Sequence, residues 1–255
     1  IMPSFDIRTK TCFVFDLEGT VYRGDDPVPG TVDFIQRNLG QREIFFLTNN
    51  TSKNLADYAS KLARLGIEVG LERILSPLQA LIAYLREQGV MRIYPVGNSN
   101  FQSYLKAQLP DIVFSAGDDC QAVVLACDAE LNYVKMTTPC LLLKRPEVRF
   151  LSTRPACACP SSPSADAFVQ RYHAVTGRLP EVVFGKPSTF VLAPLLKRFR
   201  PEEVVMVGDR LCTDQQLAQN AGIDFILVLS GEAQRKDLLG LGKQPSLVVE
   251  HLGAL

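Results

Sequence analysis

The sequence has no net charge and no long apolar segment. Lysine plus arginine number 27 and aspartate plus glutamate also number 27, so no overall positive field attracts nucleic acid or an anionic membrane. No apolar run approaches the ~20 residues that a membrane-spanning helix needs. The first residues also lack a basic segment followed by an apolar one. We therefore expect a cytoplasmic protein with no nucleic-acid or membrane partner.

Histidine is rare, and the cysteines form no recognisable site. The two histidines, His173 and His251, stand far apart in polar, helix-like segments, so neither is a candidate for catalysis. Seven cysteines, an odd number scattered among apolar neighbours, suit reduced thiols better than a disulfide framework. Cys157 and Cys159 lie in a Pro- and Ser-rich stretch, but no second pair at zinc spacing accompanies them. The chemistry must therefore come from other residue types.

What the sequence does contain is an alternation of apolar strand-like runs with helical patterns, which is typical of βαβ units and a parallel sheet. The 255 residues, 47% of them hydrophobic, suffice for one large or two modest domains. Strands are expected over 12–15, 44–47, 92–96, 112–114, 122–126, 149–151, 182–184, 204–207, 225–229 and 247–249, and helices over 55–65 and 78–85.

The two ends of the chain together supply one parallel sheet, and the middle supplies a smaller α/β unit. The simplest architecture is an α/β fold whose doubly wound core, residues 1–77 and 181–255, is interrupted by a domain inserted over residues 78–180.

The first expected strand ends on two carboxylates. Residues 12–20 read Cys-Phe-Val-Phe-Asp-Leu-Glu-Gly-Thr, in which Asp16 and Glu18 lie two positions apart. In an extended chain these side chains point to the same side. Ligands of open parallel sheets bind beyond the carboxyl ends of the strands, so both acids could face one substrate. Taken alone, the segment is equally compatible with an ordinary strand that ends in solvated acids.

Polar residues also follow a second strand, the apolar run 45–47. Thr48, Asn49 and Asn50 come directly after it and precede the helix expected over 55–65. Free backbone N–H groups at a helix N-terminus favour an anion such as phosphate. The same residue types are common helix caps, and the two interpretations are compatible.

Two later strands end in the same way. The run 182–184 leads into Gly185-Lys186-Pro187, which places a lysine at a strand end. The run 204–207 leads into Gly208-Asp209, with Asp214 near the start of the next helix. Each feature alone is weak, because most lysines are solvated and acids are common near helix N-termini.

Taken in their order along the chain, the strand ends at Asp16, Thr48, Lys186 and Asp209 resemble those of haloacid dehalogenase (HAD) superfamily phosphatases. The resemblance is specifically to the NagD-like, nitrophenylphosphatase-like class IIA branch. The resemblance runs nearly end to end, through segments 15–24, 46–52, 184–188, 207–214 and 227–231. It implies a Rossmann-like core with an inserted α/β cap domain that determines substrate specificity. It also implies a Mg²⁺-dependent phosphatase that hydrolyses small phosphate monoesters.

The resemblance further implies a role for each acid. Asp16 would be the nucleophile that forms an aspartyl-phosphate, and its second oxygen would bind Mg²⁺. Asp209 and the backbone carbonyl of Glu18 would be further metal ligands, and Asp214 would orient a metal-bound water or the lysine. Glu18 would serve as general acid and then as general base.

The resemblance also implies which residues hold the phosphoryl oxygens of the substrate, namely Thr48, Asn49, Asn50 and Lys186. A carboxylate that attacks a phosphate meets an anion of its own sign, so cations and hydrogen-bond donors must offset the repulsion.

The sequence departs from the family pattern at two places. The second acid is normally an aspartate, and the extra methylene of Glu18 changes the geometry of proton transfer. This keeps open the alternative of a catalytically weak or inactive phosphate-ligand-binding protein of the same fold. In the cap, Arg154 and the Cys157/Cys159 segment replace an acidic or Asn-Pro-Asp sequence, so the substrate is not assigned. A homodimer through the cap is expected by analogy only.

Overall fold

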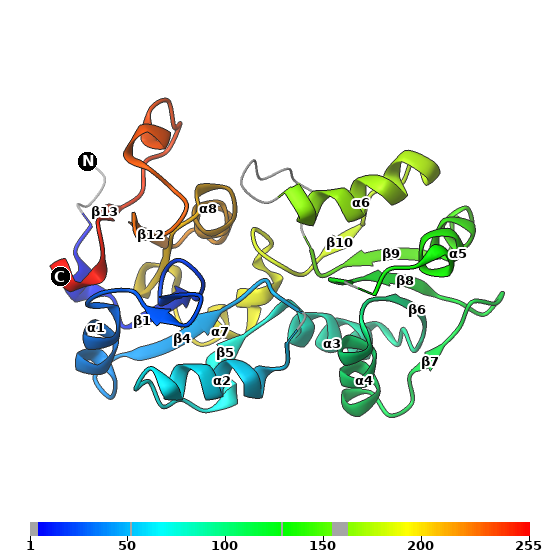
Figure 1. The fold of residues 1–255 in the computed structure, drawn as a ribbon, viewed down its shortest axis with the longest axis horizontal. Coiled ribbons are helices and arrows are strands. Elements are labelled where there is room, and N and C mark those ends of the chain that lie inside the picture. Colours follow the sequence, from blue (N-terminus) through cyan, green and yellow to red (C-terminus); the bar gives the residue numbers. More distant parts are fainter. Residues whose placement is uncertain (1–4, 52, 129, 155–162) are drawn as a thin grey trace. The chain divides into compact units, whose positions relative to one another are not determined.

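The computed structural model describes residues 5–51, 53–128, 130–154 and 163–255. The chain forms two compact units. The first consists of Ile1–Thr48, Leu55–Leu75 and Leu192–Leu255, and the second of Asn49–Asn54 and Ser76–Val191. In Figure 1 the first unit combines blue with orange and red segments, so the two ends of the sequence build it together. Each unit contains a parallel sheet, which confirms the predicted α/β class.

The first unit is built on a six-stranded parallel sheet in the order β13-β12-β11-β1-β4-β5. From β1 the chain first adds strands on one side and later, from β11 onward, on the other, so the sheet is doubly wound as predicted. The strands are β1 Cys12–Asp16, β4 Glu43–Leu47, β5 Ile74–Leu75, β11 Val204–Gly208, β12 Asp224–Val228 and β13 Leu247–Val249.

Helices and a short hairpin complete the first unit. All five residues of β1 are buried, and Phe13 and Phe15 pack against Phe34 of the first helix. Helix α2 ends just before Gly66, whose φ of +83° is the left-handed conformation that glycine adopts readily at a helix C-terminus. The elements are α1 Thr31–Asn38, α2 Leu55–Arg64, α7 Ala193–Leu196, α8 Gln216–Ala221 and the antiparallel hairpin of β2 Tyr22–Arg23 with β3 Asp26–Pro27.

The second unit has a five-stranded parallel sheet in the order β10-β9-β8-β6-β7. Its first helix begins with Pro77 and ends just before Gly89. Ser76 precedes this helix, and its N–H donates to Gln79 Oε1 at 3.0 Å. The elements are α3 Pro77–Gln88, β6 Arg92–Val96, α4 Ser99–Gln108, β7 Val113–Phe114, β8 Ala122–Leu125, α5 Tyr133–Leu143, β9 Arg149–Ser152, α6 Pro163–Thr176 and β10 Val182–Val183.

The limits of the units differ from the boundaries drawn on the sequence. The inserted domain was expected to end at residue 180, but β10 pairs with β9 and the second unit extends to Val191. The division into a core, residues 1–77 and 181–255, and an inserted cap domain, residues 78–180, stays a proposal. None of the helices in the described ranges is long and apolar enough to cross a membrane.

Most described cysteines are buried or half-buried thiols. Cys12, Cys120, Cys127 and Cys140 are free, and burial raises the pKa of Cys12 to about 12. The Cys12 thiol is therefore a poor nucleophile, because the thiolate is the reactive form. Cys212 is disulfide-bonded, so the expectation of reduced thiols is wrong for that residue. Cys157 and Cys159 lie outside the described residues.

Candidate active site

Three aspartates meet at the carboxyl end of the first sheet. Asp16 is the last residue of β1, Asp209 follows its neighbour β11, and Asp214 lies in the π-helical turn Leu211–Gln215. One carboxylate oxygen from each lies within 4.8 Å of those of the other two, and all three residues are buried. The group stands where the strand order of the sheet reverses, the usual ligand site of open α/β sheets.

Glycines allow the backbone to approach these carboxylates closely. A Cβ added at Gly231 would lie 1.9 Å from Asp209 Oδ2, and one added at Gly19 would lie 2.4 Å from it. A Cβ at Gly208 would lie 2.4 Å from Asp214 Oδ2. At each of these positions a larger residue would have to displace an aspartate, so the glycines are part of the site.

Backbone N–H groups hold two of the aspartates. The N–H of Glu232 donates to Asp209 Oδ2 at 2.8 Å, and the N–H of Arg210 donates to Asp214 Oδ2 at 3.1 Å. Hydrogen bonds from N–H groups stabilise the charged form of a carboxylate. The loops therefore fix the positions of both carboxylates.

The donor set suits a hard divalent cation. Three buried carboxylates at this separation repel one another, and a bound cation offsets the repulsion. Carboxylate oxygens are the ligands preferred by Mg²⁺, Ca²⁺ and Mn²⁺, whereas Zn²⁺ sites usually include nitrogen or sulfur ligands. The residues present therefore fit the magnesium site expected from the sequence.

Glu18 does not belong to this group of carboxylates. Its side chain is exposed, and Glu18 Oε1 accepts a hydrogen bond of 2.8 Å from the N–H of Gly24 at the tip of the β2–β3 hairpin. The sequence pattern placed it on the same side as Asp16. The glycine at the hairpin tip, six residues further on, was not recognised as its partner.

Thr48, the first residue after β4, is buried in the first unit, and its N–H donates to Leu75 O at 3.2 Å. Its place at a strand end is the one predicted.

In the second unit, Asn49 and Lys186 are joined by two hydrogen bonds. Lys186 N–H donates to Asn49 Oδ1 at 2.7 Å, and Asn49 Nδ2 donates to Lys186 O at 3.0 Å. Lys186 is only 3% exposed, whereas Asn50 is exposed. A Cβ at Gly185 would lie 2.5 Å from Thr153 O, which explains the glycine before the lysine. The Asn49 amide thus fixes the backbone of the predicted phosphate-binding lysine.

Tyr22 was not recognised from the sequence. It is 3% exposed, and burial raises its pKa, with further contributions from Tyr58, Glu18 and Asp16 in that order. A lone tyrosine after a Gly-Thr turn carries no sequence signal for such a position.

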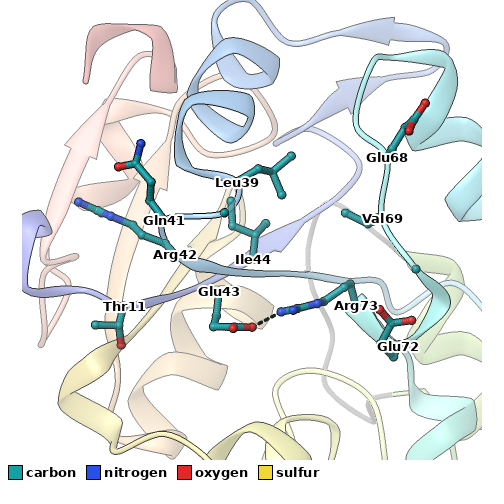
Figure 2. Close-up of a pocket in the computed structure, with 12 residues that line it drawn as sticks. Thr11, Leu39, Gln41, Arg42, Glu43, Ile44, Glu68, Val69, Glu72 and Arg73 are labelled. Carbon is teal, nitrogen blue, oxygen red and sulfur yellow. Dashed lines mark hydrogen bonds and ion pairs between the residues drawn. The ribbon is translucent and has the colours of Figure 1, made fainter.

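A separate hollow of about 390 Å³ lies at the opposite, amino-terminal end of the same strands (Figure 2). Leu39, Ile44 and Val69 supply its apolar part, and Glu43 and Arg73 form an ion pair at its edge. None of the site residues predicted from the sequence lines it. The hollow is therefore distinct from the aspartate group.

Family models match both ends of the chain. A model described as haloacid dehalogenase-like hydrolase matches residues 13–108, and a second HAD-hydrolase-like model matches residues 183–255. These two ranges contain all three aspartates of the group and Lys186.

Individual relatives align over most of the chain. Phosphoglycolate phosphatase 2 of Arabidopsis thaliana is 31% identical over 264 residues, which cover 91% of this chain and 87% of that protein. The putative NipSnap protein K02D10.1 of Caenorhabditis elegans is 32% identical over 239 residues and 79% of this chain, which spans only 45% of that longer protein. The crystal structure of a 4-nitrophenylphosphatase from Thermotoga maritima superimposes with a TM-score of 0.87 at 31% identity, covering 96% of this chain and 95% of that one.

Proposed function

The chain belongs to the haloacid dehalogenase-like hydrolases, in the class IIA branch of NagD and the 4-nitrophenylphosphatases, and we propose that it hydrolyses small phosphate monoesters through an aspartyl-phosphate on Asp16. It is an enzyme of the phosphomonoesterase type that its relatives represent. The observation that carries the proposed mechanism is the buried group of Asp16, Asp209 and Asp214 at the end of β1 and β11.

The metal proposed for this group is Mg²⁺. Asp16, Asp209 and the backbone carbonyl of Glu18 would hold it, and Asp214, fixed by the Arg210 N–H, would stand beside them. When bound, the ion supplies positive charge against the substrate phosphate and the attacking carboxylate. The buried positions of the acids support this assignment, because buried charges of one sign need a counter-ion.

The chemistry proceeds in two displacements at phosphorus. A carboxylate oxygen of Asp16 forms a bond to phosphorus while the bond to the ester oxygen breaks, and Glu18 gives a proton to that leaving oxygen. Water then forms a bond to phosphorus, the bond to Asp16 breaks, and Glu18 takes the proton from the water. Inorganic phosphate leaves, and both acids return to their starting states.

Four residues are proposed to bind the phosphoryl group. Lys186 would supply a positive charge, and Thr48, Asn49 and Asn50 would supply hydrogen-bond donors, as negative charge spreads over the phosphoryl oxygens. The bonds between Asn49 and the Lys186 backbone support a rigid placement of the lysine.

One observation favours a second candidate function. The Glu18 carboxylate is exposed and bonded to the hairpin, and it is absent from the aspartate group. If it does not reach the leaving oxygen, the protein would bind phosphate ligands and turn them over weakly or not at all. This alternative keeps the same fold and the same anion site.

An assay with 4-nitrophenyl phosphate separates the two functions. We expect Mg²⁺-dependent turnover by the native chain and a loss of at least about a thousandfold in Asp16→Asn, which removes the nucleophile. Glu18→Asp tests whether the glutamate is an impairment, in which case that variant is faster. Native turnover no higher than that of Asp16→Asn would reject the phosphatase and leave the binding protein.

The substrate is a small phosphorylated metabolite. Relatives include phosphoglycolate phosphatases and a glycerol-3-phosphate phosphatase, so a screen should begin with two- and three-carbon alkyl phosphates. Arg154 in the second unit is half-buried, and its N–H donates to Ser152 Oγ at 3.0 Å. Its guanidinium is a candidate contact for a second anionic group of the substrate.

We also propose a homodimer formed through the second unit. Helix α5 exposes Tyr133, Val134 and Leu141, which are 77%, 59% and 64% accessible. Val134 and Leu141 are seven positions apart and therefore share one face of the helix. Large exposed apolar side chains on one face are typical of a protein interface.

A further inference from the structure

A lysine of helix α2 contacts the tip of the β2–β3 hairpin. Lys61 Nζ donates to Gly24 O, lies 3.6 Å from Asp25 Oδ1 and stands 3.8 Å from the centroid of the Tyr22 ring. Its side chain is 14% exposed, although its acidic neighbour Asp25 is 96% exposed. An ammonium over an aromatic face and near a carboxylate is attracted to both. Lys61 therefore attaches helix α2 to three residues of the hairpin segment, Tyr22, Gly24 and Asp25.

The same hairpin residue that Lys61 holds is also bonded to Glu18. Gly24 accepts from Lys61 with its carbonyl and donates with its N–H to Glu18 Oε1 at 2.8 Å. Gly24 has a φ of +55°, a left-handed conformation that glycine adopts without strain. Lys61 thus binds the carbonyl of Gly24, and Glu18 binds the N–H of the same residue.

The loop that carries Glu18 is tied to the base of the hairpin. Gly19 N–H donates to Tyr22 O at 2.8 Å, and the N–H groups of Val21 and Tyr22 donate to Leu17 O at 2.8 and 3.2 Å. The backbone around Glu18 is therefore well fixed. Its side chain is exposed, however, and an exposed glutamate keeps considerable rotamer freedom unless a specific contact restrains it. Among the described residues, the Gly24 N–H provides that contact.

The length of the glutamate matches this arrangement. An aspartate at position 18 would be shorter by one carbon–carbon bond, about 1.5 Å, and would not reach the Gly24 N–H from the same backbone. With Oε1 occupied by Gly24, the second oxygen, Oε2, is the one that can carry a proton. The hairpin tip therefore selects both the rotamer of Glu18 and the oxygen that transfers the proton.

We propose that Lys61 is a positioning residue for the acid–base step: by holding Gly24, it fixes the Glu18 carboxylate in its working orientation. This rests on the proposed role of Glu18 as general acid and base. In the first displacement the proton moves from Oε2 to the leaving oxygen, and in the second it moves from water back to Oε2. Lys61 contacts neither substrate nor reacting atoms in this scheme.

The dependence of rate on the leaving group tests the proposal. Phenolate is a poorer leaving group than 4-nitrophenolate and gains more from protonation by an acid. A loss of acid function therefore slows phenyl phosphate more than 4-nitrophenyl phosphate, whereas a general loss of folded enzyme slows both equally. The two substrates are compared by kcat/KM, which reports the first displacement alone, because the second displacement is common to both. The ratio of the two kcat/KM values is insensitive to the amount of folded protein.

Five variants complete the experiment. In Lys61→Met we expect kcat/KM to fall about tenfold or more for phenyl phosphate and at most about twofold for 4-nitrophenyl phosphate. Glu18→Gln should change the ratio in the same direction, and the double variant should be no slower than Glu18→Gln, since both act on one step. Lys61→Arg should restore the native ratio. Arg64→Met, which removes an exposed cation from the same helix, is the matched control and should keep it.

Hydrogen exchange provides a measurement that does not depend on turnover. Lys61→Met should speed exchange of the backbone amides in a peptide that covers the hairpin, and Arg64→Met should not. A native ratio of kcat/KM in Lys61→Met, together with a changed ratio in Glu18→Gln, would overturn the role of Lys61 and leave the proposed function intact. An unchanged ratio in Glu18→Gln would overturn the acid role of Glu18, and the inference with it.

Discussion

At the residue scale, the site depends on glycines as much as on acids. Gly231→Ala should move Asp209, because the new Cβ would lie 1.9 Å from Asp209 Oδ2 in the present backbone. Mg²⁺ that binds only the folded protein raises its melting temperature. We expect the variant to lose most of this rise and at least about tenfold in kcat, since small displacements at a reacting centre are costly.

The matched control is Gly242→Ala, because a Cβ at Gly242 meets no atom within 4 Å. It should keep the native response to Mg²⁺. A Gly231→Ala protein that is stabilised by Mg²⁺ as strongly as the native chain would show that the close approach to Asp209 is not needed for metal binding.

The sequence was informative for these acids for a physical reason. Asp16 and Asp209 stand at the ends of short apolar runs, and a buried parallel strand fixes what stands at its carboxyl end. The position of the Glu18 carboxylate was not predictable in this way. It depends on a rotamer and on a hairpin tip that Lys61 contacts from a helix 37 positions further along the chain.

At the scale of elements, Lys10 links the start of three strands of the first sheet. Its Nζ is ion-paired with Asp224, the first residue of β12, and donates to Glu202 O just before β11, while Lys10 itself precedes β1. Burial alone would raise the pKa of Asp224, but hydrogen bonds from Lys10 and Ser246 outweigh it and hold that pKa below its ordinary value.

A pH dependence of stability follows from this lowered pKa. Because the folded-state pKa lies below 3.8, the stabilisation is fully present above that pH and is lost as the pH falls through the folded-state value. Asp224→Asn should lower the free energy of unfolding by about 1 kcal/mol near neutral pH, after allowance for solvent screening. Urea unfolding of both proteins should show this difference shrinking below a pH of about 3.8. A difference that stays constant down to about pH 3 would contradict the assignment.

The elements for which no range was predicted from the sequence include three very short strands and the helices α1, α4, α5 and α6. β2, β3 and β5 have two residues each, so alternation of apolar and polar positions cannot be recognised in them. The longer strands β1, β6 and β11 and the helices α2 and α3 were predicted to within a few residues at their ends. The end of the inserted unit was harder to predict, because only the pairing of β10 with β9 assigns that strand to the second sheet.

At the scale of the whole molecule, both units use the same construction. In each, the strand order reverses beside the first long strand, β1 or β6, so each unit is a complete doubly wound sheet. The chain enters the second unit at Asn49 and again at Ser76, and it returns to the first at Leu55 and at Leu192. Such a unit has its own buried apolar cluster and leaves its outer helix faces available for contacts with other molecules.

Helix α5 is the surface on which we expect a second copy of the chain. Leu141→Glu places a charge in the exposed apolar face formed by Tyr133, Val134 and Leu141, and burying that charge in an interface is unfavourable. Light scattering after size exclusion should give the native chain twice its mass of 28.2 kDa and the variant a single chain mass. Leu239→Glu, which alters an 82% exposed leucine of the first unit, should remain dimeric. A native protein that stays monomeric as its concentration is raised would reject the dimer, whereas a dimeric Leu141→Glu would place the interface elsewhere. Because Leu141 and the three aspartates belong to different units, the monomeric variant should retain its affinity for Mg²⁺.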